Sequence, residues 1–199
     1  MIAYEFKLTS TGLLPQDNGY ILLSALSRKF PFLHGKKDVQ IAPLRGTRTR
    51  DSRHIQIDHK SILHIRGITA DQAVEISDSW VMAQGSMIHV EKSRPKELSP
   101  SDYLASRLVV LKSAVSKADF KCELATMLPE GVDYHVGNRR RSIRVKGRFY
   151  LGFSVHLKGL TPEASMQIQA GGIGKFTSMG CGVFYKGNPL SRAHGGNRP

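Results

Sequence analysis

The pattern of hydrophobic and polar positions predicts strands and helices in an order that repeats once along the chain. Residues 2–9 alternate as a half-buried strand does, and residues 16–18 can cap a helix whose apolar face continues until Pro31 ends it. Thr69 can cap a second helix. The inward side chains of these two helices are predicted to be Ile21, Leu22, Ala25 and Leu26, followed by Ala73, Ile76 and Trp80. Further strands are predicted at residues 39–44, 53–58, 61–65 and 87–90.

A second cycle follows a polar segment at residues 93–101, whose charged residues and prolines are typical of a linker. Strands are predicted at residues 104–111, 144–157 and 182–185, and helices at residues 117–127 and 161–169. This order indicates an α+β protein of two tandem ferredoxin-like (RRM-like) domains with a C-terminal Gly-rich loop. We expect an N-terminal domain at 1–92, a linker at 93–101, a C-terminal domain at 102–187 and a loose tail at 188–199.

Composition adds a strong charge to this picture. The chain has 29 Lys and Arg residues against 16 Asp and Glu residues, a formal net charge of +13. This balance favours a polyanionic partner, with nucleic acid as the first candidate. A basic surface that serves only solubility, or attraction to an anionic membrane, is the alternative. No apolar run approaches a membrane span and the start does not resemble a signal peptide, so a cytoplasmic location is expected.

Paired glycines near the C-terminus flank a polar turn with one cation, Lys175. Glycine adopts positive φ without penalty, so successive N–H groups could converge on a phosphate. The segment lacks the residues of a Walker A loop and of a dinucleotide fingerprint. The alternative is that the glycines end the preceding helix and form a tight turn. The candidate loop residues are Gly171, Gly172, Gly174, Gly180 and Gly182.

One of the eight histidines has an unusual neighbourhood. His34 follows the first helix and is surrounded by glycine and two cations, Lys36 and Lys37. Metal-independent RNA cleavage needs a base for the ribose 2′-OH, an acid for the departing 5′ oxygen and cations for the phosphorane. Neighbouring positive charge favours a neutral imidazole, which suits the role of base. We therefore expect His34 to be the base and one of the lysines to stabilise the phosphorane.

No cofactor and no metal site are expected. His54, His59 and His64 are spaced so that they fall on alternating faces of the predicted strands, and two cysteines are too few for a zinc site.

Two basic clusters are candidates for binding phosphates. The denser one spans residues 137–148, and the other follows Pro43. Either cluster could instead be solvated surface charge. The candidate RNA-binding residues are Arg45, Arg48, Arg50, Arg139, Arg140, Arg141, Arg144, Lys146 and Lys175.

Several segments, in their order, resemble the CRISPR-associated repeat-RNA processing endoribonucleases of the repeat-associated mysterious protein (RAMP) superfamily. The resemblance spans most of the chain. Its segments are Leu14-Pro15-Gln16-Asp17-Asn18-Gly19-Tyr20, Ala25-Leu26-Ser27-Arg28, Leu33-His34, Ile41-Ala42-Pro43-Leu44-Arg45-Gly46, Arg139-Arg140-Arg141, Gly152-Phe153-Ser154-Val155, Gly159-Leu160-Thr161-Pro162-Glu163, and the Gly-rich loop from Gly172 to Gly182.

The resemblance implies tandem ferredoxin-like folds and metal-independent cutting of precursor CRISPR RNA, leaving 5′-hydroxyl and 2′,3′-cyclic phosphate ends. It also implies that the product stays bound within an interference complex with other Cas proteins. In such enzymes a His after the first helix acts on the 2′-OH, a place that His34 occupies, and a Tyr and a Lys assist, for which Tyr20 and Lys36 or Lys37 are the nearest candidates. The alternatives are a non-cleaving RNA-binding subunit of a CRISPR complex and a general single-strand binder.

Overall fold

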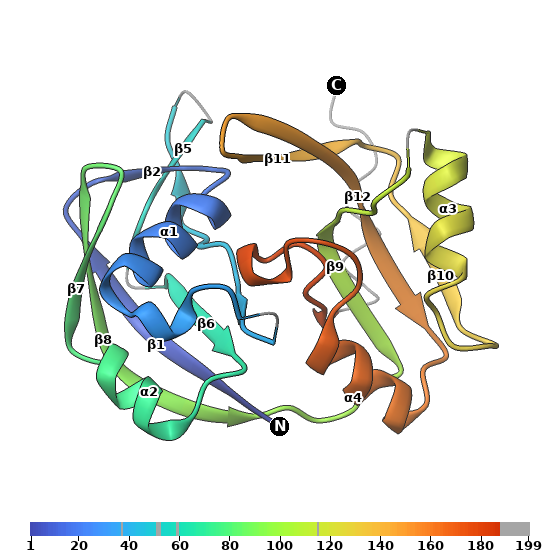
Figure 1. The fold of residues 1–199 in the computed structure, drawn as a ribbon, viewed down its shortest axis with the longest axis horizontal. Coiled ribbons are helices and arrows are strands. Elements are labelled where there is room, and N and C mark those ends of the chain that lie inside the picture. The colour runs from blue at the N-terminus through green and yellow to red at the C-terminus, as the bar shows by residue number, and fades with distance from the viewer. Residues whose placement is uncertain (37, 51–52, 59, 115, 188–199) are drawn as a thin grey trace.

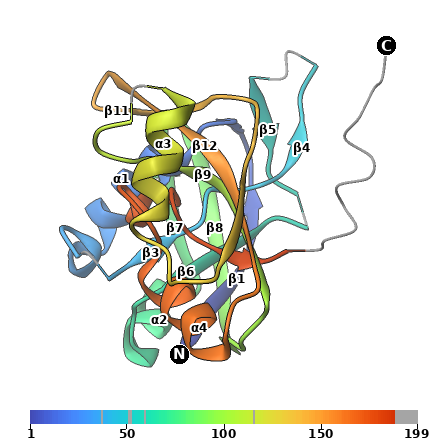
Figure 2. The same ribbon diagram turned by 90° about the vertical axis from the view of Figure 1, so that its right-hand side faces the viewer.

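The protein consists of two α+β halves that stand side by side (Figure 1). A computed structural model describes residues 1–36, 38–50, 53–58, 60–114 and 116–187. The predicted tail at 188–199 lies outside the described residues. In both halves the α-helices lie on the same side of the sheets, and β4 and β5 lie on the other side (Figure 2).

The first half is a five-stranded antiparallel sheet with the order β3-β6-β1-β8-β7. Without the edge strand β7, this is the strand order of a ferredoxin-like βαββαβ unit, because β1 lies between β6 and β8. The strands are β1 (Ile2–Ser10), β3 (Gln40–Ile41), β6 (Ile62–Arg66), β7 (Ser79–Ala83) and β8 (Ser86–Glu97), and the helices are α1 (Gly19–Lys29), the 3₁₀ turn η1 (Pro31–Leu33) and α2 (Ala70–Ile76).

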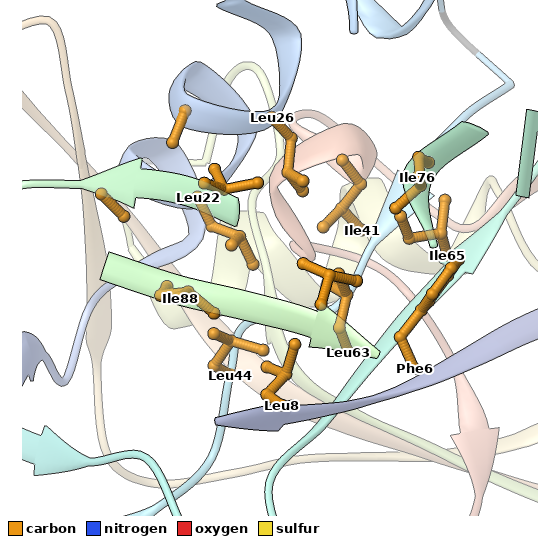
Figure 3. Packing of buried hydrophobic residues seen from close by; sticks show 14 of the residues in the cluster. Phe6, Leu8, Leu22, Leu26, Ile41, Leu44, Leu63, Ile65, Ile76 and Ile88 are labelled. Carbon is orange, nitrogen blue, oxygen red and sulfur yellow. The ribbon is translucent and has the colours of Figure 1, made fainter. Parts of the chain in front are cut away.

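Alternation along these strands builds the core of the first half. Phe6 and Leu8 of β1, with Leu63 and Ile65 of β6, are at most 1% exposed and meet the apolar face of α1 (Figure 3). Full burial of such a side chain contributes about 1.5–3 kcal/mol. Thr69 forms the predicted cap of α2, as a complete capping box with Gln72.

The second half repeats the arrangement with the strand order β10-β12-β9-β13. Its apolar core lies between this sheet and the helices, with Phe120 stacked edge-on against Phe153. The tandem ferredoxin-like fold is therefore confirmed. The elements are β9 (Tyr103–Val109), α3 (Lys117–Ala125), β10 (Asp133–Val136), β11 (Arg141–Val145), β12 (Arg148–Lys158), α4 (Pro162–Gly171), the 3₁₀ turn η2 (Thr177–Met179) and β13 (Tyr185–Lys186).

A small third sheet, β2-β5-β4, extends the first half on the side away from the helices. Buried Asn18 connects it to α1: its Oδ1 accepts from the N–H of Leu44 at 2.7 Å and its Nδ2 donates to the carbonyl of Leu44 at 3.0 Å. The side chain thus holds the loop before β4. It does not cap α1, which corrects the prediction made from the sequence. The strands are β2 (Leu13–Pro15), β4 (Thr47–Arg48) and β5 (His54–Gln56).

Arg66, only 3% exposed, joins the two halves. Its Nη1 donates to the carbonyls of Gln169 at 2.8 Å and Phe184 at 3.0 Å, and to Oε1 of Gln40 at 3.3 Å. Nε2 of Gln40 in turn donates to the carbonyl of Ala170 at 2.5 Å. Residues of the first half thus donate to two of the carbonyls at the C-terminus of α4 that have no partner within the helix. The helix dipole also favours a cation at this end of α4.

Three further predictions need correction. The segment predicted as a linker begins inside β8, since Ser93 to Glu97 pair with β1. The side chains there remain in water and β7 pairs only as far as Val90, which explains the polar composition and why Pro95 is tolerated.

The other two corrections concern the predicted strand at 144–157 and Trp80. The strand is a hairpin of β11 and β12 that turns at Lys146 and Gly147, both at positive φ. Trp80 belongs to β7, not to α2, and is 49% exposed.

We expect Arg66→Met to lower the free energy of unfolding by about 3 kcal/mol, because it leaves buried carbonyls of both halves without a donor. Urea denaturation measures the change. Arg94→Met is the matched control: Arg94 lies exposed on β8, so the effect should stay within about 0.5 kcal/mol. Equal stability of the two variants would contradict the role given to Arg66.

Candidate nucleic-acid interface

A basic groove of about 1130 Å³ runs between the two halves. Residues of β6 line it from the first half and residues of β9, β12 and β13 from the second, while Met179, Gly180 and Cys181 of the Gly-rich loop also contribute. The charged and imidazole side chains that line it are Asp17, Arg45, Arg53, Lys60, His64, Arg107, Arg139, Arg140, Arg141, His156 and Lys186.

The alternation of the strands explains why the groove lies on the face away from the helices. In β6, Leu63 and Ile65 enter the helix-covered core, so His64 points to the open face. In β12, Val155 and Leu157 are buried in the core and His156 lines the groove. The open faces of both sheets therefore form one continuous surface.

The charge of this surface is almost uniformly positive. Asp17 is the one carboxylate among the described lining residues, and its Oδ2 already accepts from the backbone N–H of Arg144 at 2.9 Å. Burial raises the pKa of Asp17, and that hydrogen bond lowers it in part. A polyanion is the ligand that such a surface favours.

Aromatic and imidazole rings line the floor of the groove. In the register of the second sheet, Tyr185 stands opposite Ala105, and Ala105 stands opposite His156, so a small residue separates two rings. Nδ1 of His156 lies 2.7 Å from the hydroxyl of Tyr103, and the guanidinium of Arg66 lies 4.5 Å from the ring centre of Tyr185. Rings on an open sheet face offer stacking platforms for unpaired bases.

His64 lies at the first-half edge of this floor. Its Nδ1 is 3.3 Å from Oε1 of Glu5, which also accepts from Lys96 at 2.6 Å, and its ring meets Tyr185 edge-on at 6.1 Å. Burial lowers the pKa of His64, and the nearby charge of Glu5 raises it in part. The neutral imidazole is thus favoured in the folded protein.

The β11–β12 hairpin adds a second basic and aromatic surface. Arg144 lies over the ring of Phe149 at 5.5 Å, and Phe149 is 67% exposed. The opposite side of the hairpin, with Ile143 and Val145, packs into the junction between the halves. Exposed aromatic rings beside guanidinium groups suit RNA, which is recognised largely by stacking and phosphate contacts.

The candidate catalytic residues lie apart from the groove. His34 and Lys36 are exposed in the loop between η1 and β3, and the side chain of His34 has no hydrogen bond or ion pair with any described residue. Tyr20, in the first turn of α1, is half-buried against the apolar cluster at the junction. Lys37, like His59, lies outside the described residues.

The Gly-rich loop is packed between the two halves. Its N–H groups at Lys175 and Gly182 donate to the carbonyls of Val110 at 2.8 Å and Leu108 at 2.6 Å. A Cβ on Gly180, at φ 80°, would stand 2.0 Å from Cδ of Pro43. These contacts favour the packing interpretation of the glycines over a phosphate cradle.

The structure brings together only part of the predicted set. Arg45, Arg139, Arg140 and Arg141 line the groove, and Arg48 lines a smaller pocket beside it. Neither cavity includes Arg50, Arg144, Lys146 or Lys175 among its described lining residues.

Sequence reasoning missed several groove residues. The one with a readable signal is Arg107, a single charge within an otherwise apolar or small stretch at residues 104–111. Lys60, His64, His156, Tyr185 and Lys186 become neighbours only through the pairing of distant strands. In the part of the chain that the structure describes, no group of three or more His, Cys, Asp or Glu side chains is placed to hold a metal ion.

Comparison with known proteins gives consistent results. The family model described as Cas6 Crispr matches residues 2–188. The CRISPR-associated endonuclease Cas6 of Myxococcus xanthus is 32% identical over 178 residues, which cover 87% of this chain and 76% of that protein.

Solved structures share the fold at low sequence identity. A CRISPR-associated protein Cas6 superposes with a TM-score of 0.71 at 15% identity, covering 94% of this chain and 99% of that one. Thermus thermophilus Cse3, bound to an RNA representing a pre-cleavage complex, superposes with a TM-score of 0.56 at 14% identity, covering 92% and 97%. Of the described helices, none has the length and apolar character needed to cross a membrane; a cytoplasmic location stays a prediction.

The lowered pKa of His64 predicts a pH dependence of stability. Below its ordinary pKa of about 6.5, the unfolded chain takes up a proton that the folded chain resists, so stability falls as the pH falls through this window. Between pH 7 and pH 5, the free energy of unfolding should decline more steeply in the wild type than in His64→Gln. Parallel urea-denaturation curves across this range would contradict the assignment.

The close approach of the Gly-rich loop predicts that Gly180→Ala lowers the free energy of unfolding by about 2 kcal/mol or more, through a strained φ and a clash with Pro43. Gly171→Ala is the matched control. A Cβ there meets nothing within 4 Å, so its effect should be neutral or stabilising by at most about 1 kcal/mol. Thermal unfolding compares the two, and a neutral Gly180→Ala would contradict the packing described.

Proposed function

The chain belongs to the Cas6 family of CRISPR endoribonucleases, and on that premise we propose that it cuts precursor CRISPR RNA without a metal, with His34 as general base. The curated relative from Myxococcus xanthus is an endonuclease, and the fold is shared with a Cse3 protein bound to RNA. The basic groove is proposed to hold the repeat RNA.

The observation that carries this proposal is the setting of His34. Its imidazole is exposed and has no partner among the described residues, and Lys36 is exposed two residues further on. The loop leads directly into β3, which packs against η2 of the Gly-rich loop, so it is anchored at the junction of the two halves. An exposed imidazole in this setting can accept a hydrogen bond from a ligand without losing a contact to any described residue.

The chemistry follows from these groups. Neutral His34 accepts the proton of a ribose 2′-OH, and the 2′ oxygen attacks the adjacent phosphorus. The bond from phosphorus to the 5′ oxygen breaks and the 5′ oxygen takes up a proton from water, while protonated His34 returns its proton to the solvent. The products carry a 2′,3′-cyclic phosphate and a 5′-hydroxyl. Lys36 stabilises the extra negative charge of the phosphorane. Lys37 and Tyr20 stay candidates for assisting.

Retention of the cut RNA, with this protein as part of a larger CRISPR complex, is the second element of the proposal. The breadth of the groove supports it, because many phosphate contacts made at once lower the rate of release. The alternative is a non-cleaving RNA-binding subunit. The groove suits both functions, and the proposed roles of His34 and Lys36 distinguish them.

We expect His34→Ala to abolish cutting of the repeat RNA from the organism's own CRISPR array, with a rate loss of at least about 100-fold, because the variant lacks the proton acceptor. Its affinity for the RNA should remain within about twofold of the wild type. Single-turnover cleavage in chelator and a filter-binding titration measure the two quantities. His135→Ala, an exposed histidine outside the groove lining, is the matched control and should cut normally.

RNA with 2′-deoxyribose at the cut position should bind to the wild type but remain intact, since it lacks the nucleophile. An intact RNA with normal ribose would favour the non-cleaving subunit. A requirement for a divalent ion, or a parallel loss of affinity and cutting in His34→Ala, would contradict the proposed role of His34.

A further inference from the structure

Four arginines converge on a small pocket of about 320 Å³ beside the main groove. Arg45 and Arg48 belong to the β4 region of the first half, Arg107 to β9 and Arg141 to β11 of the second half. Leu44, Ile55 and Gly46 form an apolar wall, and Gln16 completes the lining. The pocket therefore exists only when the two halves are docked.

The protein offsets the positive charge of this pocket only in part. Among the residues that the structure describes, none of the four guanidinium groups forms an ion pair with a carboxylate. Asp17 is the nearby acid: its charge raises the pKa of Arg107 in part, and its Oδ2 also accepts from the backbone N–H of Arg144. Burial, and after it the charges of Arg141 and Arg45, lower the pKa of Arg107.

The arrangement is also held in place. With the amide of Gln16 oriented so that its oxygen faces Arg48, that oxygen lies 3.2 Å from Nη2 and 3.3 Å from Nε, accepts from the guanidinium and fixes its direction. Asn18 fixes the backbone of Leu44, the residue before Arg45. Arg107 projects from β9 and Arg141 from β11, and both of these strands pair with β12. Guanidinium groups with fixed directions suit two-point binding of a phosphate.

We propose that this pocket is a clamp for a single backbone phosphate of the bound RNA, and that it sets the register of the strand relative to the cutting loop. The inference rests on the proposed RNA-binding function and goes beyond it, because it replaces a diffuse basic surface by one defined contact. Arg45, Arg107 and Arg141 line both the pocket and the main groove. Arg107 is chosen for the test because it stands on β9, an inner strand of the second sheet, whereas Arg45 precedes β4 and Arg141 is the first residue of β11.

The test is a binding scan with repeat RNAs that carry one neutral methylphosphonate linkage at a time, flanked by 2′-O-methyl ribose, and 2′-deoxyribose at the cut position. For the wild type we expect one linkage, or two adjacent ones, to lose about tenfold in affinity and the rest to lose little. In Arg107→Gln the same linkage should cost less than about twofold. Arg94→Gln, a cation on β8 outside both cavities, should reproduce the wild-type profile.

A flat profile for the wild type, or a sensitive linkage that costs the same in Arg107→Gln, would overturn the clamp. Without RNA, Arg107→Gln should melt at the same temperature as the wild type or at a higher one, because the substitution relieves repulsion between cations. A clearly lower melting temperature would show that the arginine cluster stabilises the fold, and it would overturn the proposal. Since the RNA cannot be cut, failure of His34 as the base leaves this result unaffected, and failure of the clamp leaves the cleavage assay unaffected.

Discussion

The relative placement of the two halves depends on a buried arginine of the first half that donates hydrogen bonds to the C-terminus of a helix in the second half. Arg66 extends from the last position of β6 to the carbonyls of Gln169 and Phe184, and Gln40 satisfies the next carbonyl of α4. A buried cation without these acceptors would be costly, and so would helix carbonyls without donors. Each half thus satisfies the polar groups of the other, which fixes the two sheets at one angle. The groove and the four-arginine pocket both follow from that angle.

This architecture separates the proposed RNA-binding groove from the proposed catalytic residue His34. The groove lies on the open faces of the sheets, whereas His34 follows the helix that covers the opposite face. The Gly-rich loop connects the two sides, since Met179 to Cys181 line the groove and η2 packs against β3, which the His34 loop enters. The groove is thus lined largely by residues of paired strands, whereas His34 and Lys36 are exposed in the loop after η1.

The excess of positive charge in the groove has an energetic consequence. Like charges held close together destabilise the folded state, and an RNA strand that neutralises them stabilises it in return. Affinity should therefore depend strongly on salt. A groove built only of such cations would bind any RNA equally well. Defined contacts, such as rings on either side of Ala105 and a phosphate held at one place, are what can distinguish one strand or register from another.

The sequence by itself determined the fold class, because alternation in residues 2–9, the cap at Thr69 and the repeated order of elements are local signals. It also indicated an anionic partner through the net charge, and selected His34 by its neighbours. It could not resolve the hairpin at Lys146 and Gly147 or the true end of β8. Only the tertiary structure placed Arg66, Arg107 and His156, because their partners are distant in the sequence and come together through strand pairing and the docking of the halves. A local pattern indicates on which face of a strand or helix a residue lies. A site shared by two domains depends on which of these faces pack against each other in the folded protein.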